Sequence, residues 1–464
     1  MTRLIVDSYE AGSGTVGGLG TFHDSLFSRL AKKYEVKTFA MMINPALPVR
    51  ESYKGIIIRR PSFEIDNATA LSFLYDLFEH YGIQYDYLNE YEIDFPPYFF
   101  RKYSCIPSPF KMAKTDLFIA NDWMSIPRSA FYSWLHPSMP QEIILHSFEP
   151  GRLGGVLHKN FNGTNDKIDE SDFLIQGSGF YTGKRIIRDL EFTLSYRIAR
   201  RLVDSIILTV SKIHRKEYFI GINKHGGDYK SIEHKVYAIY HGVDTDFYEP
   251  VKIEKEYFTI GIIGRCTPIK GFHILPGLVE RLRKRIPNLR AHIVTSTRPD
   301  NPYYLQLEKE IEEKKLHKLI NIDNTFYIGR GKVLLFNEWD VALVPSLYEP
   351  QGQVDLEAMA CGVIPAVGMG GLREKVIDGL NGIWINPYNI VESADKIYQV
   401  YKGNYNGVDI EDLRKNARKT AEYLDWDRRA RVHEKIIEFI LAGDIDKIKY
   451  IQDELTPDPR DFLG

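Results

Sequence analysis

The chain has 464 residues, 44% of them hydrophobic, and a formal net charge of -2. This length and apolar content suffice for two or three domains with large cores, and the lack of a basic surplus argues against a nucleic acid partner. The three cysteines, Cys105, Cys266 and Cys361, are scattered, and their spacing indicates neither a zinc site nor a disulfide framework.

The amino-terminal region combines an apolar run with a glycine turn. Residues 4–7 predict a strand, and the run Gly17, Gly18, Leu19 and Gly20 opens a predicted helix that reaches about residue 33. Glycine lets the backbone approach a ligand, and a helix N-terminus favours phosphate. Because the first strand starts at once and no apolar run approaches about 18 residues, we expect no signal peptide, no membrane span and a cytoplasmic location.

Apolar runs alternate with helical patterns along most of the chain, which predicts an α/β fold with two parallel-sheet domains. The first domain is expected at residues 1–243 and the second at residues 244–439. Their junction, residues 241–250, interrupts both periodicities, and the tail at residues 440–464 is expected to pack on the first domain. Strands are predicted near Leu4, Val36, Ile56, Leu117, Ile143, Ile207 and Val236, and then near Phe258, Ile293, Val341, Val363 and Ile383.

Two long segments fall outside this alternation. Residues 63–105 are rich in tyrosine and phenylalanine, which could stack on acceptor sugars or equally fill a small helical subdomain or a subunit interface. Residues 148–180 are rich in glycine and follow His146. They suggest an acceptor lid, and plain disorder fits the same composition.

Two cations follow the strand predicted at residues 258–263. Arg265 and Lys270 stand five residues apart around the turn into the next helix. Fixed cations in such a place can neutralise a diphosphate as it leaves a sugar. A solvated basic loop would show the same pattern.

The most informative motif is a pair of glutamates eight residues apart. Glu349 is predicted on the loop after the strand at residues 341–345, because Pro350 and Gly352 cannot both sit inside a helix. Glu357 is predicted on the helix that follows. In open α/β sheets the carboxyl ends of the strands are where ligands bind, so we expect both carboxylates at a ligand site.

Another glycine turn follows the strand predicted at residues 363–367. Gly370, Gly371 and Leu372 precede a helical pattern over residues 373–378, which makes the turn a candidate diphosphate cradle. A tight connection without a ligand would look the same. His146, at the end of the apolar run 143–145, is likewise compatible with a core position or a functional one.

Taken in order, these motifs resemble those of the GT-B glycosyltransferases, and most closely the glycogen and starch synthases of the short archaeal type. The resemblance spans nearly the whole chain. It implies two Rossmann-like domains facing a deep interdomain cleft, with a C-terminal helix that crosses back to the first domain. It is carried by Glu10, Thr15, Gly17, Gly18, Leu19, Asn121, Asp122, Trp123, His146, Thr209, Ser211, Gly242, Asp244, Arg265, Lys270, Glu349, Glu357, Gly370, Gly371 and Leu372.

The resemblance implies four residues at the reacting centre. Arg265 and Lys270 would hold the distal phosphate of a nucleotide sugar, and Glu349 would bind hydroxyls of the transferred sugar. His146 would offer a hydrogen bond near the reacting carbon.

The remaining implied roles concern donor and acceptor binding. Glu357 would bind the ribose, and the turn formed by Gly370, Gly371 and Leu372 would offer backbone amides to the diphosphate. Gly18 would let the amino-terminal domain approach the phosphates.

The acceptor side of the cleft is assigned to Glu10, Thr15 and Asp122. Here the chain departs from the family pattern, because synthases of this type carry a lysine where this chain has Thr15. That lysine adds positive charge near donor and acceptor, so the substitution bears on both substrates.

The expected function is therefore retaining transfer of glucose from ADP- or UDP-glucose to the non-reducing end of an α-1,4-glucan. The nucleotide sugar is a co-substrate, and no cofactor, metal, nucleic acid or membrane partner is expected. A homo-oligomer is compatible with the sequence. The alternatives are a transferase that makes a small sugar such as a disaccharide, and a catalytically silent carbohydrate-binding relative.

Three further classes fit the residues less well. A glycoside hydrolase needs carboxyls about 5–9.5 Å apart, whereas eight helical residues would span about 12 Å. Asp244 and Asp246 match the Asp-x-Asp metal signature of a different glycosyltransferase fold, but they lie in the junction and suit a turn. The first glycine turn lacks the Gly-x-Gly-x-x-Gly spacing of a dinucleotide-dependent oxidoreductase.

Overall fold

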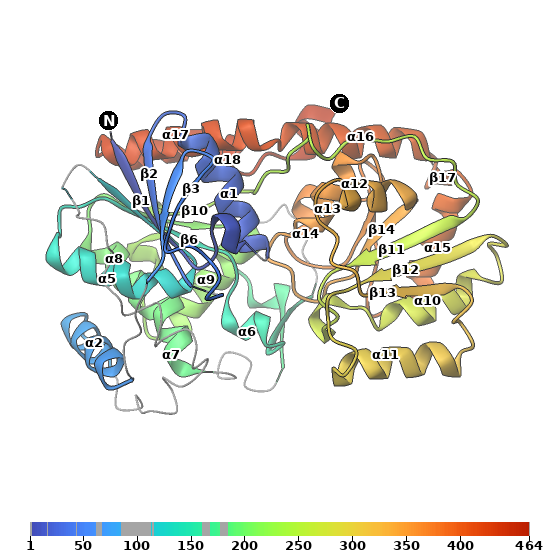
Figure 1. Ribbon diagram of the computed structural model, residues 1–464, viewed down its shortest axis with the longest axis horizontal. Coiled ribbons are helices and arrows are strands. Elements are labelled where there is room, and N and C mark those ends of the chain that lie inside the picture. Colours follow the sequence, from blue (N-terminus) through green and yellow to red (C-terminus); the bar gives the residue numbers. More distant parts are fainter. Residues whose placement is uncertain are drawn as a thin grey trace. The chain divides into compact units, whose positions relative to one another are not determined.

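The computed structural model describes residues 2–15, 17–42, 44–61, 67–84, 113, 116–159, 168–176 and 184–463. The chain divides into two compact units, here called unit 1 and unit 2 (Figure 1). Unit 1 consists of Met1–Pro150, Ser178–Tyr240 and Asp427–Thr456, and unit 2 of Gly151–Gly177, His241–Trp426 and Pro457–Gly464. Compared with the predicted domains, residues 151–177 and 241–243 group with the second unit and residues 427–439 with the first. Of the tail predicted to pack on the first domain, residues 440–456 group with unit 1, but residues 457–464 group with unit 2. The aromatic segment beyond residue 84 lies outside the described residues.

In its described part, unit 1 contains an eight-stranded sheet in the order β10-β9-β6-β5-β1-β2-β4-β3. Neighbouring strands are parallel except for β3, which pairs with β4 in the antiparallel sense. The central strands β5, β6 and β9 are buried along their whole length, as continuous apolar runs in parallel sheets are. The bounds are β1 (Arg3–Ser8), β2 (Glu35–Ala40), β3 (Arg50–Tyr53), β4 (Ile56–Arg59), β5 (Leu117–Asn121), β6 (Gln141–Leu145), β9 (Ser205–Thr209) and β10 (Val236–Ala238).

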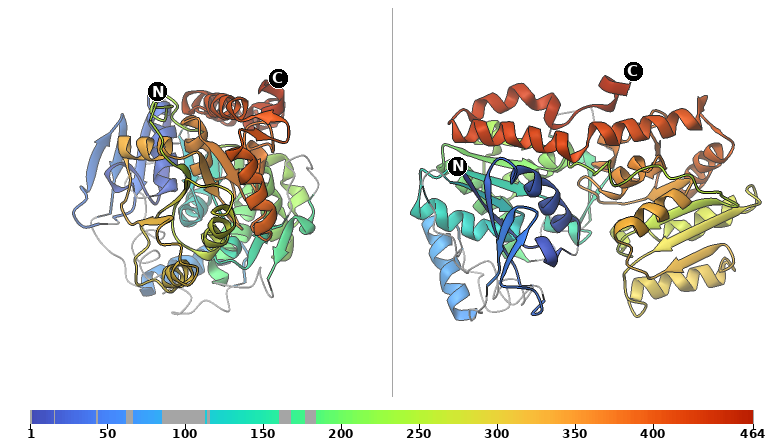
Figure 2. Two further views of the ribbon diagram at one scale, coloured as in Figure 1. Left: turned by 90° about the vertical axis from the view of Figure 1, so that its right-hand side faces the viewer. Right: turned by 45° about the horizontal axis from the view of Figure 1, so that its top comes forward.

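Helices of unit 1 include one from each end of the chain. Helix α17 (Trp426–Leu441), drawn in red in Figure 2, is tied to α1 (Gly18–Leu30) and to the turn after it. Arg29 of α1 pairs with Asp427 at 2.5 Å, and Lys33, three residues beyond α1, pairs with Glu438 at 2.5 Å. The return of the tail to unit 1 therefore rests partly on exposed charge. The other α-helices described in this unit are α2 (Asn67–His80), α5 (Ile126–Leu135), α7 (Arg185–Arg188), α8 (Ser195–Arg201), α9 (Lys212–Lys224) and α18 (Gln452–Leu455). Helix α6 (Glu149–Arg152) begins in unit 1 and ends in unit 2.

Unit 2 contains a fully parallel sheet in the order β13-β12-β11-β14-β15-β16. Two small antiparallel pairs, β7 with β8 and β17 with β18, complete its described strands. The bounds are β7 (Val156–His158), β8 (Phe173–Ile175), β11 (Phe258–Ile263), β12 (Leu289–Val294), β13 (Ile320–Asp323), β14 (Val341–Val344), β15 (Ile364–Val367), β16 (Ile383–Trp384), β17 (Asn404–Tyr405) and β18 (Val408–Asp409).

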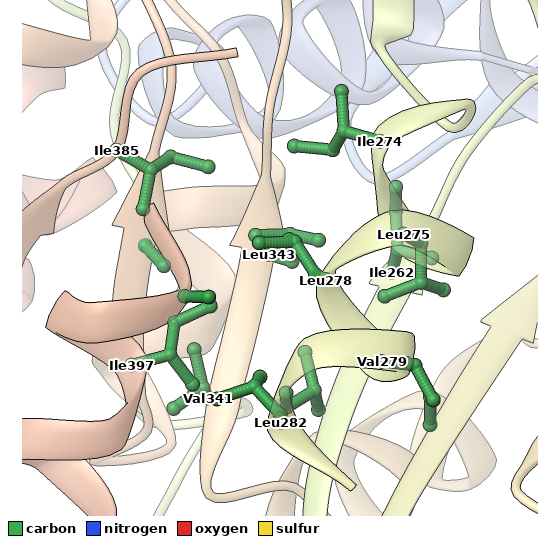
Figure 3. Close-up of a cluster of buried hydrophobic side chains, with 14 of the residues drawn as sticks. Ile262, Ile274, Leu275, Leu278, Val279, Leu282, Val341, Leu343, Ile385 and Ile397 are labelled. Atoms are coloured by element: carbon green, nitrogen blue, oxygen red, sulfur yellow. The ribbon is translucent and has the colours of Figure 1, made fainter. Parts of the chain in front are cut away.

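Helices cover both faces of this sheet, because side chains alternate along each strand. Val341 and Leu343 enter one core cluster with α10 (Ile274–Leu282) and α15 (Ile390–Tyr401), as Figure 3 shows. Ala342, between them, enters a second cluster with α12 (Gly329–Glu338) and α13 (Val354–Ala360). The remaining helices are α11 (Pro302–Glu313), α14 (Leu372–Lys375), α16 (Ile410–Tyr423) and α19 (Pro459–Leu463).

The predicted strands are found, and the helix predicted at residues 373–378 is shorter than expected. Helix α14 stops at Lys375, and in the segment that follows, side chains accept from backbone amides. Asn381 Oδ1 accepts from the Ile377 amide at 2.7 Å, and Asp378 Oδ1 accepts from the Trp384 amide at 2.6 Å. Strands β3 and β13 and both small strand pairs were not predicted.

Candidate active site

The predicted cation and carboxylate meet at the carboxyl edge of the unit 2 sheet. Strands β11 and β14 are neighbours, so the loops that follow them emerge side by side. Lys270 Nζ lies 2.5 Å from Glu349 Oε2, which also accepts from Ser346 Oγ at 3.2 Å. Both side chains of the ion pair are partly buried, which reduces screening by solvent. The sequence placed Glu349 on a loop and Lys270 at the opening of the next helix, and the structure brings them into contact.

A glycine fixes the approach of these two loops. Gly271 has φ of +73°, and a Cβ built on it would lie 2.2 Å from the Pro345 carbonyl oxygen. The Leu347 amide donates to the Ile269 carbonyl at 2.8 Å across the same contact. The backbone of the first loop is thereby seated on the second, which sets the position of Lys270.

Glu357 lies on α13, as predicted, and is buried with two partners. Lys332 Nζ is 2.7 Å from Glu357 Oε2, and the Tyr248 hydroxyl donates to Glu357 Oε1 at 3.1 Å. Burial and the Glu357 charge raise the pKa of Tyr248, so the hydroxyl stays protonated and remains a donor. Lys332, on α12, was not predicted, because its pairing joins side chains of two separate helices.

The second glycine turn packs against the Glu349 loop. Gly370 has φ of +82°, and the Gly371 amide donates to the Glu349 carbonyl at 3.0 Å. A Cβ on Gly371 would lie 1.8 Å from the Pro350 carbonyl oxygen, so only glycine fits. In this structure the turn supports the loop, and its use as a phosphate cradle, with Leu372 at the start of α14, stays a prediction.

A buried ion pair below the loop was missed by the sequence reasoning. Lys375 Nζ lies 2.9 Å from Asp355 Oδ2, and both side chains are 0% exposed. The same ammonium donates to the carbonyls of Gln351 at 2.8 Å and Gly352 at 3.0 Å. Burial raises the pKa of Asp355, and the Lys375 charge opposes that rise. This pair pins the turn between Glu349 and α13.

Arginines near the site differ in what they contact. Arg265 is exposed on the turn after β11, and within the described residues its side chain has no hydrogen-bond or ion-pair partner. Arg373 instead donates to the carbonyls of Gly368 at 2.7 Å and Ile385 at 3.0 Å. Arg265 is therefore available to a ligand, whereas Arg373 holds the glycine turn.

In unit 1, the predicted residues near the first glycine turn form one cluster. Glu10 Oε2 accepts from the amides of Gly17 at 2.8 Å and Gly20 at 3.2 Å, at the start of α1. The Thr15 hydroxyl donates to Asp24 Oδ2 at 2.7 Å. A Cβ on Gly18 would meet nothing within 4 Å, so that position is open.

A second cluster in unit 1 contains Asp122 and His146. Asp122 has φ of +80°, an uncommon backbone conformation that is enriched at functional sites, and its Oδ1 accepts from the His146 amide at 3.3 Å. His146 Nε2 lies 2.8 Å from Asn121 Oδ1, which places the ring proton on Nε2. Burial lowers the pKa of His146 to about 4. The ring is therefore neutral at pH 7.

Hydrogen bonds join the two clusters of unit 1. Asn121 Nδ2 donates to Ser8 Oγ at 2.9 Å, and Ser8 Oγ donates to the Glu10 carbonyl at 2.8 Å. Ser8 and Asn121 are register partners on β1 and β5, which explains how the two loops meet.

The described residues show neither a cluster of metal ligands nor a helix that could span a membrane. Among the residues that the structure describes, no group of three or more His, Cys, Asp or Glu side chains is arranged to hold a metal ion. Asp244 Oδ1 accepts from the Phe247 amide at 3.3 Å, as in a turn. None of the described helices is long and apolar enough to cross a membrane.

Most of unit 2 matches a known protein family. Residues 244–422 match the family described as Glycosyl transferases group 1. This region is a group 1 glycosyltransferase domain. It contains Arg265, Lys270, Glu349 and Glu357.

Three sequence relatives of this chain are all distant. An uncharacterized glycosyltransferase of Methanocaldococcus jannaschii, MJ1607, is 26% identical over 61% of this chain and 66% of its own length. A glycogen synthase of Kosmotoga olearia is 23% identical over 72% of this chain and 75% of its own. A D-inositol 3-phosphate glycosyltransferase of Kribbella flavida is 26% identical over 35% of this chain and 42% of its own.

Solved structures share the fold of this chain over almost its whole length. Sucrose-phosphate synthase from Thermosynechococcus elongatus has a TM-score of 0.63 at 17% identity, covering 96% of this chain and 100% of its own. Anabaena Alr3699/HepE, in complex with UDP and glucose, has a TM-score of 0.61 at 15% identity, and the match covers 94% of this chain and 100% of its own. The catalytic domain of starch synthase IV from Arabidopsis thaliana, bound to ADP and acarbose, has a TM-score of 0.61 at 15% identity, and the match covers 95% of this chain and 99% of its own. The predicted GT-B fold and family resemblance are confirmed.

Proposed function

We propose that the protein is a retaining glycosyltransferase that moves glucose from ADP- or UDP-glucose to the non-reducing end of an α-1,4-glucan. The observation that carries this proposal is the Lys270–Glu349 pair at the carboxyl edge of a group 1 glycosyltransferase domain. The similarity to a glycogen synthase supports the choice of acceptor.

The donor is held mainly by unit 2. Arg265 and Lys270 neutralise the diphosphate, and Glu349 accepts hydrogen bonds from the sugar hydroxyls. When the diphosphate arrives, Lys270 turns part of its charge from Glu349 to the phosphate, which frees carboxylate lone pairs for the sugar. Glu357, held by Lys332 and Tyr248, accepts from the ribose hydroxyls.

The transfer step breaks the bond between the anomeric carbon and the diphosphate oxygen and forms a bond from that carbon to the acceptor oxygen. The acceptor hydroxyl proton passes to the departing diphosphate on the same face, so configuration is retained. Arg265 and Lys270 stabilise the charge that develops on the leaving group. The neutral His146 lies near the reacting carbon, with its ring held by Asn121 and its backbone by Asp122.

A small-sugar product is the second candidate. Two observations favour it: the similarity in fold to sucrose-phosphate synthase, and a threonine in place of the family lysine. The Thr15 hydroxyl is directed to Asp24 and adds no positive charge.

Nucleotide release from a panel of donors and acceptors tests both candidates. ADP- and UDP-sugars are each supplied with glycogen, with free and phosphorylated monosaccharides, and with water, and the Glu349→Ala variant serves as the blank. We expect release that depends on glycogen. Release only with a monosaccharide or its phosphate would replace the glucan synthase with the second candidate. No consumption of any donor would favour a catalytically silent relative.

A further inference from the structure

The β7–β8 hairpin belongs to unit 2 although the chain on either side of it belongs to unit 1. Gly151–Gly177 groups with unit 2, between Met1–Pro150 and Ser178–Tyr240 of unit 1. The two strands pair Val156 with Ile175 and His158 with Phe173. The contacts of this hairpin explain its assignment.

His158 joins the hairpin to the loop that carries Glu349. The His158 amide donates to the Leu347 carbonyl at 2.9 Å, and the Glu349 amide donates to His158 Nδ1 at 3.3 Å. Between these two bonds, the Tyr348 ring lies against the imidazole with ring centroids 4.7 Å apart. Main chain and side chain of one histidine thus hold three consecutive loop residues.

Glycines enclose this contact on two sides. A Cβ on Gly370 would lie 1.8 Å from His158 Nδ1, and a Cβ on Gly151 would lie 2.1 Å from the Tyr348 ring. The imidazole therefore also lies against the second glycine turn, which itself donates from Gly371 to the Glu349 carbonyl. Three segments meet at one buried ring: the hairpin, the Glu349 loop and the glycine turn.

The protonation of His158 suits an acceptor at Nδ1. The side chain is 0% exposed, and burial lowers its pKa to about 3, so the ring is neutral at pH 7. Because Nδ1 accepts the Glu349 amide, the ring proton is on Nε2, which has no partner among the described residues. Burying an unpaired N–H is costly, and phenylalanine would fill the space without that cost. A phenylalanine could not accept the hydrogen bond from the Glu349 amide, whereas His158 Nδ1 does.

We propose that His158 is a positioning residue for Glu349, holding the backbone of its loop through Nδ1 so that the carboxylate faces the donor sugar beside Lys270. The proposal rests on the proposed function only for the role of Glu349 toward the sugar. His158 touches neither substrate nor reacting atoms in this account.

Two substitutions separate the acceptor from the ring. His158→Phe keeps an aromatic ring against Tyr348 and removes the acceptor. His158→Asn loses the ring and places Oδ1 near the position of Nδ1, where it can accept the same amide. His317→Phe and His317→Asn, at an exposed position of the same unit, are the matched controls.

Kinetics and nucleotide binding give the first readout. We expect His158→Phe to lower kcat/KM for the nucleotide sugar by about 10- to 100-fold, as small displacements of positioned groups do. His158→Asn should recover to within about threefold of the wild-type protein. The Kd of the free nucleoside diphosphate, which lacks the sugar, should change less than twofold in both. Equal losses in the two variants, or a full rate in His158→Phe, would overturn the proposal.

Hydrogen exchange of the Glu349 amide gives a second readout that needs no activity. We expect exchange in peptides covering residues 347–351 to accelerate at least about tenfold in His158→Phe and to stay near the wild-type rate in His158→Asn. If no donor is consumed by any form of the protein, the proposed function fails while this measurement still decides the role of His158. Unchanged exchange in His158→Phe would reject the Nδ1 bond.

Discussion

The two units hold their carboxylates in different ways. In unit 2 each central carboxylate lies beside an ammonium group: Glu349 beside Lys270, Asp355 beside Lys375, and Glu357 beside Lys332. In unit 1 the carboxylates of Glu10 and Asp122 accept from backbone amides. A lysine can exchange one anionic partner for another when a charged ligand arrives, whereas a carboxylate bound to backbone fixes the shape of a loop. Unit 2 is suited to a diphosphate, and unit 1 to a preformed surface around a neutral histidine.

The largest expected effect is on the stability of unit 2. Lys375→Met leaves the buried Asp355 carboxylate without its ammonium partner and removes the donor to the Gln351 and Gly352 carbonyls. We expect a loss of about 3–5 kcal/mol in the free energy of unfolding of this unit. Urea unfolding, followed by hydrogen exchange in peptides from unit 2, measures it.

A matched double variant gives the control for this loss. Asp355→Leu combined with Lys375→Met removes both charges, so much of the stability should return. A loss below about 1 kcal/mol in the single variant would show that the ion pair does not hold the loop.

Arg265 is the second cation predicted to bind the diphosphate, and its replacement tests that role. Since its side chain is exposed and has no partner in the described structure, Arg265→Ala should leave stability within about 0.5 kcal/mol. We expect kcat to fall by about 10² to 10³, as when one group stabilising a developing charge is removed. Arg298→Ala, at a side chain 84% exposed in the same unit, is the control. A rate equal to that of the control would refute the role of Arg265 in departure of the diphosphate.

Sequence reasoning succeeded where chemistry and local pattern coincide. Short apolar runs predicted every strand of the two main sheets except β3 and β13, and proline with glycine placed Glu349 on a loop and Glu357 on a helix. Strand β13 was missed because polar residues such as Asn321 interrupt its apolar pattern.

Local sequence pattern could not predict the side chains that support the Glu349 loop, because their partners are distant in sequence. Lys375 lies 20 residues from Asp355, and Glu349 is 191 residues from His158. The nearby sequence of His158 does not indicate a partner, and the partner is known only once the hairpin is seated on unit 2. Such contacts depend on the path of the chain between the units, which periodicity does not specify.

Unit 1 should respond to pH through a buried carboxyl. Burial raises the pKa of Glu142 to about 8, next to His433, whose pKa burial lowers to about 3; His433 Nδ1 is 3.9 Å from Glu142 Oε1. Between pH 4.5 and 8 the unfolded chain releases the Glu142 proton while the folded protein keeps it. Stability therefore falls as pH rises through this window, by up to about 1.4 kcal/mol per pH unit.

Glu142→Gln mimics the protonated carboxyl and measures this effect. Unfolding free energies of the variant and the wild-type protein should agree near pH 4.5 and diverge up to pH 8, with the variant more stable. Glu233→Gln, at an exposed position of the same unit, controls for the loss of one negative charge. Parallel curves would mean that Glu142 is ionised in the folded protein.

The smallest effect is expected at Thr15, where the chain departs from the pattern of the synthases that it resembles. Its hydroxyl donates to Asp24 Oδ2, and Asp24 Oδ1 in turn accepts from the Gly12 amide at 2.9 Å, so the hydroxyl helps to hold the loop before α1. Thr15→Val should lower the stability of unit 1 by about 1 kcal/mol, and Thr15→Ser, which keeps the hydroxyl, by much less. If Thr15 acts only through Asp24, the KM for donor and acceptor should stay within about twofold in both variants. A rise in acceptor KM in Thr15→Val alone would give the hydroxyl a direct contact with the acceptor, and unit 1 would then contribute a binding group where we infer only a fixed surface.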